Sequence, residues 1–385
     1  MYKAEILADS INPQKDRITT MKITFPRMML AELNTHRMFS RNSASSRAIP
    51  FNKMVKMVEE NPFIPIAWQK DHKGMQGSDY ITDEKIIDFK KGVWIQARNE
   101  AINRARELNS NISIIKKGTL QEVLGTEIPK TAVTKQLCNR LLEPFMWHEV
   151  IITATEFENF FKLRCPQYDV NGNLFRSKKD ALEYTATTFH EGRKQLIRYN
   201  NLGWLSINKS QADIHIQAIA ELMWDAYNES KPKQLSSGEW HIPFGNNMDI
   251  NLLKDEVVKH WASTDRNRVL AYAARHEYVR EKEIEYYQIR QKIATARCAR
   301  ISYQTLGDNP KIDYEADIRL HDILAESGHW SPFEHVARAM SEKEYGMYTL
   351  TEPSYSEEFD NYVTTGVCRN FRGFIQFRSL VDNKS

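Results

Sequence analysis

A change of sequence period near the N-terminus constrains this chain most, because a strand pattern gives way to a helix pattern at a proline. Residues 18–25 (Ile-Thr-Thr-Met-Lys-Ile-Thr-Phe) alternate like a strand. Pro26 then opens a run whose apolar residues recur at helical spacing, namely Met28, Met29, Leu30 and Leu33. We therefore expect a strand, then a helix, with residues 35–47 at the end of that helix and in the turn after it.

Helical patterns dominate the rest of the chain, with a few strands between them. Further strand candidates are residues 148–154 and 361–367. The helical patterns cover residues 84–108, 130–143, 156–164, 211–229, 252–297 and 315–327. This mixture predicts an α+β fold. A chain of 385 residues, of which 41% are hydrophobic, can bury the core of one large domain or two ordinary ones.

Charge and cysteine usage narrow the class of protein. The 53 basic and 50 acidic residues nearly balance, so nothing global indicates a protein that wraps a polyanion, and we expect no nucleic-acid partner. Four cysteines lie far apart without a C-x-x-C pair, which favours reduced thiols; they are Cys138, Cys165, Cys298 and Cys368. No apolar run has membrane-spanning length, and the N-terminus lacks a signal-peptide profile. We expect a cytoplasmic protein without a membrane partner.

The segment 35–47 is the strongest indication of function. It reads Thr-His-Arg-Met-Phe-Ser-Arg-Asn-Ser-Ala-Ser-Ser-Arg, with three arginines, four serines and no acidic residue. Guanidinium groups and short hydroxyl and amide donors match the oxygens of a phosphate. The segment lacks the glycines of a P-loop or a dinucleotide-binding turn, so side chains would hold the anion. On composition alone, a solvated basic face or a nucleic-acid patch remains the alternative.

Three other places carry polar groups, each with an ordinary structural explanation. Arg140 lies at the end of an amphipathic helix pattern, where a surface arginine is the alternative to a ligand contact. Arg164 ends an aromatic-rich helix, where a cation already favours the helix dipole. Residues 328–335 place two histidines and a carboxylate around a proline turn, but not with His-Glu-x-x-His spacing, so we expect no metal.

Together these segments resemble the flavin-dependent thymidylate synthases. The family signature has the form Arg-His-Arg-x-x-Ser-x-Asn-Glu-x-Ser-x-Arg, and the matching residues are His36, Arg37, Ser40, Asn42, Ser45 and Arg47. Three positions depart from the family pattern: Thr35 replaces the leading arginine, Ser43 the glutamate, and Ala48 the tyrosine that usually follows.

Other family elements are present in a different order. Arg140 falls in what looks like the Ala-Arg-x-x-Leu-Pro helix, and Asn159 and Arg164 match the strand-and-helix segment that follows it. Residues 299–303 and 328–335 resemble two motifs that ordinarily precede the signature, but here they come more than 250 positions after it. This order is a circular permutation, as in bacteriophage-type members. A single site then requires that the fold bring residues 302–334 against the segment 35–47.

The resemblance implies a family core, an antiparallel sheet with long helices, that is permuted and carries helical insertions. Residues 1–228 would form its first part, with insertions near 51–125 and 166–209. Residues 229–290 would be a linker and helical elaboration, and residues 291–385 the second part of the same core.

The resemblance also implies an activity, the reductive methylation of dUMP to dTMP. Methylenetetrahydrofolate would donate the carbon and NADPH the hydride, with FAD as carrier. The implied dUMP-binding residues are Ser43, Ser45, Ser46, Arg47, Arg140 and Arg164, of which Arg164 would be catalytic by polarising the pyrimidine. The implied FAD-binding residues are His36, Arg37, Asn159, Ser302, Ser331 and Glu334. The usual assembly is a homotetramer, and a phage-encoded member would act in the host cytoplasm.

The departure at Ser43 leaves substrate and product open. Loss of a carboxylate near the nucleotide is compatible with methylation of dCMP or with a 5-hydroxymethyl product. A group from the C-terminal segment, such as Arg372 or Gln376, is an alternative replacement for it. A further alternative, from another functional class, is a nucleotide-binding module without catalysis.

Overall fold

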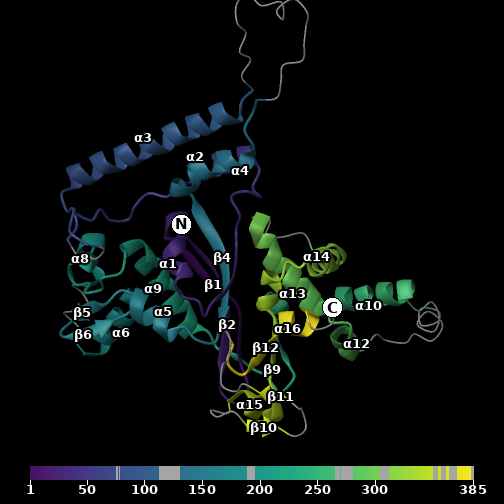
Figure 1. Ribbon diagram of the computed structural model, residues 1–385. Coiled ribbons are helices and arrows are strands. Elements are labelled where there is room, and N and C mark those ends of the chain that lie inside the picture. The colour runs from purple at the N-terminus through teal and green to yellow at the C-terminus, as the bar shows by residue number, and fades with distance from the viewer. Residues whose placement is uncertain are drawn as a thin grey trace, which may run out of the picture.

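The computed structural model describes residues 1–74, 77, 79–111, 131–188, 196–264, 269, 281–303, 312–349, 354–356, 361–363 and 371–382. These residues form an α+β fold in which helices surround a mixed sheet (Figure 1). The sheet has the strand order β3-β4-β2-β1-β7. Its strands are β1 (Lys3–Ile11), β2 (Arg17–Pro26), β3 (Ser40–Ser43), β4 (Trp147–Ala154) and β7 (Lys233–Gln234). Neighbours run antiparallel except β1 and β7, which are parallel.

Shorter strands and many helices complete the described residues. The other strands are β5 (Tyr168–Val170), β6 (Asn173–Phe175), β8 (Trp240–His241), β9 (Ala337–Ala339), β10 (Ser354–Ser356), β11 (Asn361–Val363) and β12 (Phe374–Gln376). The α-helices are α1 (Leu30–Asn34), α2 (Phe51–Glu60), α3 (Glu84–Asn109), α4 (Lys135–Cys138), α5 (Glu158–Arg164), α6 (Lys178–Thr188), α8 (Asn201–Ser206), α9 (Ile214–Glu229), α10 (Ile250–Thr264), α12 (Glu281–Tyr286), α13 (Ile289–Arg300), α14 (Tyr314–Glu326), α15 (Glu342–Thr349) and α16 (Phe377–Asp382). The 3₁₀ helices are η1 (Arg27–Met29), η3 (Asn139–Phe145), η4 (Gly245–Asn247), η5 (Ile301–Tyr303) and η6 (Ser331–Glu334).

The sheet is covered on both faces, as the alternation of β4 shows. Val150 and Ile152 belong to an apolar cluster with the buried residues of α5 and α9. Ile151, between them, packs instead with Cys298 and Ile301 from α13 and η5. A strand buried on both faces needs a continuous apolar run, which is what β4 carries. In Figure 1, α5 and α9 lie on one side of the sheet and α13 and α14 on the other.

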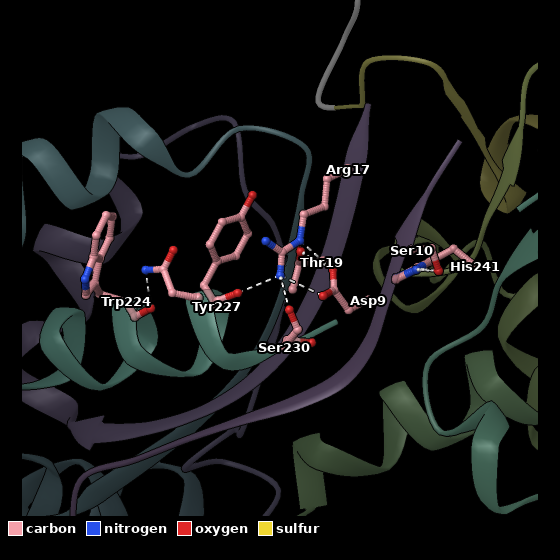
Figure 2. Close-up of polar contacts among 9 residues, drawn as sticks. Asp9, Ser10, Arg17, Thr19, Trp224, Tyr227, Ser230 and His241 are labelled. Atoms are coloured by element: carbon pink, nitrogen blue, oxygen red, sulfur yellow. Dashed lines mark hydrogen bonds and ion pairs between the residues drawn. The ribbon is translucent and has the colours of Figure 1, made fainter. Parts of the chain in front are cut away.

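A guanidinium group fastens α9 to the sheet. Arg17 on β2 donates to both carboxylate oxygens of Asp9 on β1, at 2.9 and 2.7 Å, and to the carbonyl oxygens of Tyr227 and Ser230 at 2.6 and 3.5 Å (Figure 2). Its guanidinium carbon also lies 3.7 Å from the centroid of the Tyr227 ring. Arginine therefore caps the C-terminal carbonyls of α9, where a positive charge also complements the helix dipole.

A buried polar chain crosses the sheet. Hydrogen bonds join Ser10 to His241 (2.9 Å), His241 to Thr20 (2.8 Å), Thr20 to Thr153 (2.7 Å) and Thr153 to His335 (2.8 Å); the first contact is drawn in Figure 2. Burial lowers the pKa of both histidines to about 3, so both are neutral at neutral pH. This series of hydrogen bonds connects strands within the first 154 residues to His241 and His335.

Several elements predicted from sequence are confirmed. The strands predicted at 18–25 and 148–154 are β2 and β4, and the helices predicted at 84–108, 156–164, 211–229 and 315–327 are α3, α5, α9 and α14. The helix predicted at 130–143 is the short α4 followed by the 3₁₀ helix η3, and residue 130 lies outside the described residues. Of the strand predicted at 361–367, residues 361–363 form β11 and the rest lies outside them. The periodicity did not predict β1.

The single helix predicted over 252–297 is wrong. Helix α12 ends at Tyr286, and Gln288 adopts a left-handed conformation with φ of 55° before α13 begins. The break lets apolar residues of α10 and α13, such as Val257 and Ile293, pack into one cluster. One straight helix would keep these residues far apart, so burial of their side chains favours a broken helix.

Candidate functional site

The segment 35–47 forms an edge strand as well as a turn. Helix α1 ends at Asn34, and residues 40–43 form β3, in which Ser40 pairs with Thr153 and Ser43 with Val150 of β4. The prediction of only a helix end and a turn is therefore wrong for residues 40–43. The free edge of β4 explains the difference, because backbone groups at a buried edge need hydrogen-bond partners.

Two residues from the far end of the sequence lie against this segment. Ser45 donates its backbone N–H to the carbonyl of Ser302 at 3.0 Å, and the Ser302 hydroxyl donates to the carbonyl of Ser43 at 3.4 Å. The Ser331 hydroxyl donates to Oδ1 of Asn42 at 3.2 Å. The fold thus brings residues 302 and 331 to the segment, as the permuted motif order requires.

Glu334 is held at the same edge by the C-terminal helix. Arg378 Nη1 donates to Glu334 Oε1 at 2.5 Å, and Gln376 Nε2 donates to the Ser40 hydroxyl at 3.0 Å. Burial lowers the pKa of Arg41, and the negative charge of Glu334 acts against this shift. Gln376 and Arg372 are the two C-terminal candidates to replace the carboxylate missing at Ser43. Gln376 contacts the segment 35–47, whereas Arg372 forms an ion pair with Asp16 at 2.9 Å.

Arg164 is anchored by the start of the segment. Its Nε donates to His36 Nε2 at 3.0 Å, and its Nη2 donates to the Thr35 hydroxyl at 3.2 Å. The His36 ring packs against Phe39 and Phe160 and is 8% exposed, so it presents little surface to a ligand. Burial, together with the charges of Arg164 and Arg41, lowers the pKa of His36 to about 4. A neutral His36 with its proton on Nδ1 can accept the Arg164 hydrogen bond.

The local sequence explains where Arg164 sits. Cys165 precedes Pro166 and adopts an extended conformation, which ends α5 at Arg164. The guanidinium is therefore in the last turn, where the helix dipole favours a cation. Thr35, which departs from the family signature, gives it a second acceptor.

Three other arginines at the site are free of partners within the described residues. Arg37, Arg47 and Arg140 are exposed, and none makes a hydrogen bond or an ion pair there. Asn159 is also exposed, in the first turn of α5, with its backbone N–H bonded to Glu156 Oε1 at 3.0 Å. Unpaired guanidinium groups are the donors that a phosphate or carboxylate ligand needs.

A buried asparagine fixes the loop that carries Arg47. Asn139 Nδ2, just before Arg140, donates to the carbonyls of Ser46 and Ile49 at 2.7 and 2.9 Å. The Ser46 hydroxyl donates to Glu143 Oε1 at 2.5 Å, so Ser46 is already engaged within the chain. Sequence reasoning missed Asn139 and Glu143, because both lie inside a helix pattern and no motif marks them.

The site residues form two groups at opposite ends of β3. Arg164, His36 and Thr35 lie before the strand, and the loop with Ser45 and Arg47 follows it. A strand rises about 3.3 Å per residue, so the two ends of β3 are roughly 10 Å apart. A single ligand that contacts both must span about this length.

The segment 35–47 lines neither of two cavities that the described residues form, of about 410 and 670 Å³. In the same residues no group of three or more His, Cys, Asp or Glu side chains could hold a metal ion.

The described helices also include none long and apolar enough to cross a membrane. Three cysteines are free and buried, and Cys368 lies outside the described residues.

Comparisons with known proteins give little further identification. No family model matches the chain, and no curated protein matches it. Among solved structures, the chain is similar to a UMP/dUMP methylase, PolB from Streptomyces cacaoi, bound with 5-Br UMP. The TM-score is 0.34 at 12% sequence identity, over 60% of this chain and 89% of that chain. At this TM-score the likeness establishes neither a common fold nor a common activity.

Proposed function

We propose that this chain is an FAD-dependent thymidylate synthase that methylates dUMP to dTMP, with methylenetetrahydrofolate as carbon donor and NADPH as reductant. One observation carries the proposal. Ser43 and Asn42 are hydrogen-bonded to Ser302 and Ser331, which lie 259 and 289 positions away in the sequence. A permuted motif order can form one site only when the fold joins these two parts, so the contacts support the resemblance.

The two groups at the ends of β3 suit the two ends of a nucleotide. Arg47 and Arg140 would bind the phosphate, since both are exposed and unpaired within the described residues. Ser45, with its hydroxyl also unpaired there, would add a short donor. Arg164, at the other end of the strand, would then face the pyrimidine.

Arg164 has the donors that this role needs. A guanidinium has five N–H donors, and Arg164 uses two of them within the chain, on His36 and Thr35. The remaining donors can bind a pyrimidine carbonyl oxygen. Negative charge develops on that oxygen as C5 becomes nucleophilic, and a fixed cation beside it lowers the barrier. His36 would then act by holding Arg164 rather than by contacting FAD.

The donor set also fits an anionic cofactor. Arg37 is an exposed, unpaired cation within the described residues, and Ser331 is an exposed hydroxyl at the same edge of the sheet. Arg37 would bind the pyrophosphate of FAD, with Asn159, Ser302 and Ser331 along the flavin. FAD, when bound, supplies the redox chemistry that carries the methylene group and the hydride to the ring.

The exposure of Arg37, Arg47 and Arg140 favours a site that another copy of the chain completes. Exposed arginines on a surface cannot exclude water from two large ligands, and exclusion of water strengthens the electrostatic effect of a cation. We therefore propose a homo-oligomer, with a tetramer as in the family.

Two measurements on the purified protein test the proposal. Its visible spectrum should show bound flavin that bleaches when NADPH is added. Incubation with NADPH, methylenetetrahydrofolate and dUMP tritiated at C5 should release tritium, because only the true substrate loses its C5 hydrogen.

The same assay separates the alternatives. Tritium release from labelled dCMP instead of dUMP would identify a dCMP enzyme, and a 5-hydroxymethyl product would be seen by mass spectrometry. A colourless protein that does not take up FAD would overturn the proposal in favour of a nucleotide-binding module.

A further inference from the structure

A second potential site lies on the outer face of α9, away from the segment 35–47. A half-open cavity of about 410 Å³ lies there between α9, α8 and the loop at residues 66 and 67. Helix α9 lines it with a stripe at helical spacing, which includes Ala218, Glu221, Leu222 and Asp225. Its volume is within the range of small-molecule sites, roughly 300 to 1,000 Å³.

Aromatic rings form one wall of this cavity. Tyr168 and Trp204 meet edge to face with centroids 4.9 Å apart, and both line the space. Lys178 Nζ lies 5.9 and 6.0 Å from their centroids, which adds cation–π attraction within the wall. Most of the remaining lining is aliphatic. Such a wall favours a flat, apolar ring over a hydrated ion.

The polar groups of the cavity fall into two kinds. Glu221 is satisfied, because it accepts from the Tyr168 hydroxyl at 3.2 Å and the Lys178 backbone N–H at 2.8 Å. In contrast, Oδ1 of Asp225 and the hydroxyl of Tyr2 are buried without a hydrogen-bond partner among the described residues. Buried polar atoms of this kind are rare, because each one costs free energy unless a ligand or water satisfies it.

The Asp225 carboxylate is only partly satisfied within the chain. Burial raises its pKa to about 6, and the negative charges of Glu221 and Asp180 act in the same direction, against the hydrogen bond from Ser177. At neutral pH the carboxylate is ionised, and the charge of Lys179 offsets only part of this repulsion. A positively charged or N–H-rich ligand group would relieve both the burial and the repulsion.

We propose that this cavity binds a flat aromatic ring that carries N–H donors, such as an amino-substituted heterocycle or an arylamidine. The ring lies against Tyr168 and Trp204, and its N–H group donates to the carboxylate of Asp225. None of these residues belongs to the segment 35–47, and the inference does not rest on the function proposed above.

Calorimetric titration of the full-length protein tests this inference. The probes are benzamidine and adenine, which carry N–H donors, and toluene, which has a similar ring without them. Wild-type protein should bind benzamidine and adenine saturably, each at least tenfold more tightly than toluene.

Two variants locate the binding. Asp225→Asn keeps the side-chain shape and should weaken benzamidine by about tenfold or more while leaving toluene unchanged. Ala218→Phe should fill the cavity and abolish binding of all three probes. Glu326→Gln, which changes an exposed carboxylate on α14, is the matched control and should bind like wild type. Absence of saturable binding in wild type, or wild-type affinity for benzamidine in Asp225→Asn, would overturn the inference.

Discussion

The arginines at the candidate site differ in how firmly the chain holds them. Arg164 is half-buried, and its guanidinium is anchored by His36 and Thr35. Arg47 and Arg140 are exposed, with no partner among the described residues. An anchored cation can stabilise charge that develops at one atom in a transition state, whereas a free cation provides charge to a phosphate in many geometries. The difference therefore supports the proposed roles, which are chemistry for Arg164 and binding for Arg47 and Arg140.

Replacement of Arg164 tests the difference between anchored and free arginines, and it should have the largest effect on kcat. Arg164→Ala should lower kcat for tritium release from dUMP by about a thousandfold, because removal of one preorganised donor costs roughly 100- to 1,000-fold. Flavin absorbance should persist, since the variant leaves Arg37 in place. A variant with near wild-type kcat would remove Arg164 from the chemistry.

Replacement of His36 tests whether the anchor itself matters. His36→Leu removes the acceptor for Arg164 Nε, so kcat should fall by about a hundredfold, in the range expected when a catalytic group is misplaced by about 1 Å. His36→Gln retains a side-chain acceptor and should recover much of that loss. Steady-state kinetics should show the effect in kcat with little change in KM. Equal activity of the two variants would mean that the hydrogen bond does not orient Arg164.

Replacement of the free arginines should affect binding instead. Arg47→Ala and Arg140→Ala should each raise KM for dUMP by about tenfold with kcat nearly unchanged, as expected for the loss of one charge-assisted phosphate contact. Arg37→Ala is the matched control, because it removes another exposed cation, which is proposed to bind FAD. It should weaken flavin retention and leave KM for dUMP unchanged. A fall in kcat for Arg47→Ala would erase the distinction between free and anchored arginines.

The sequence predicted the regular elements of this fold better than its edges. Strand β2 and helix α9 carry periodic apolar patterns and β4 a continuous apolar run, and burial accounts for all three. Strand β3 has the sequence Ser-Arg-Asn-Ser, which has no apolar alternation, and it is a strand because β4 offers a free edge. Tertiary pairing of this kind cannot be read from a local pattern.

The same limit applies to the candidate site. The resemblance identified Ser302 and Ser331 as neighbours of the segment 35–47, and the contacts of both with that segment confirm this. It could not identify Asn139 or Gln376, whose side chains hold the segment in place. Their roles depend on which carbonyl or hydroxyl group the fold brings within 3 Å, and no motif records that.

Thr35 allows the smallest and most specific test of the comparison. Its hydroxyl accepts from Arg164 Nη2 at 3.2 Å, at an exposed position where water can replace it. Thr35→Val keeps the branched shape and removes the acceptor, so kcat should fall only about threefold, less than for His36→Leu, because a solvent-exposed hydrogen bond contributes about 0.5 to 1 kcal/mol. Thr35→Ser should retain wild-type kcat. If Thr35→Val matched the loss seen in His36→Leu, the two acceptors would hold Arg164 equally, and the buried histidine would not be its main anchor.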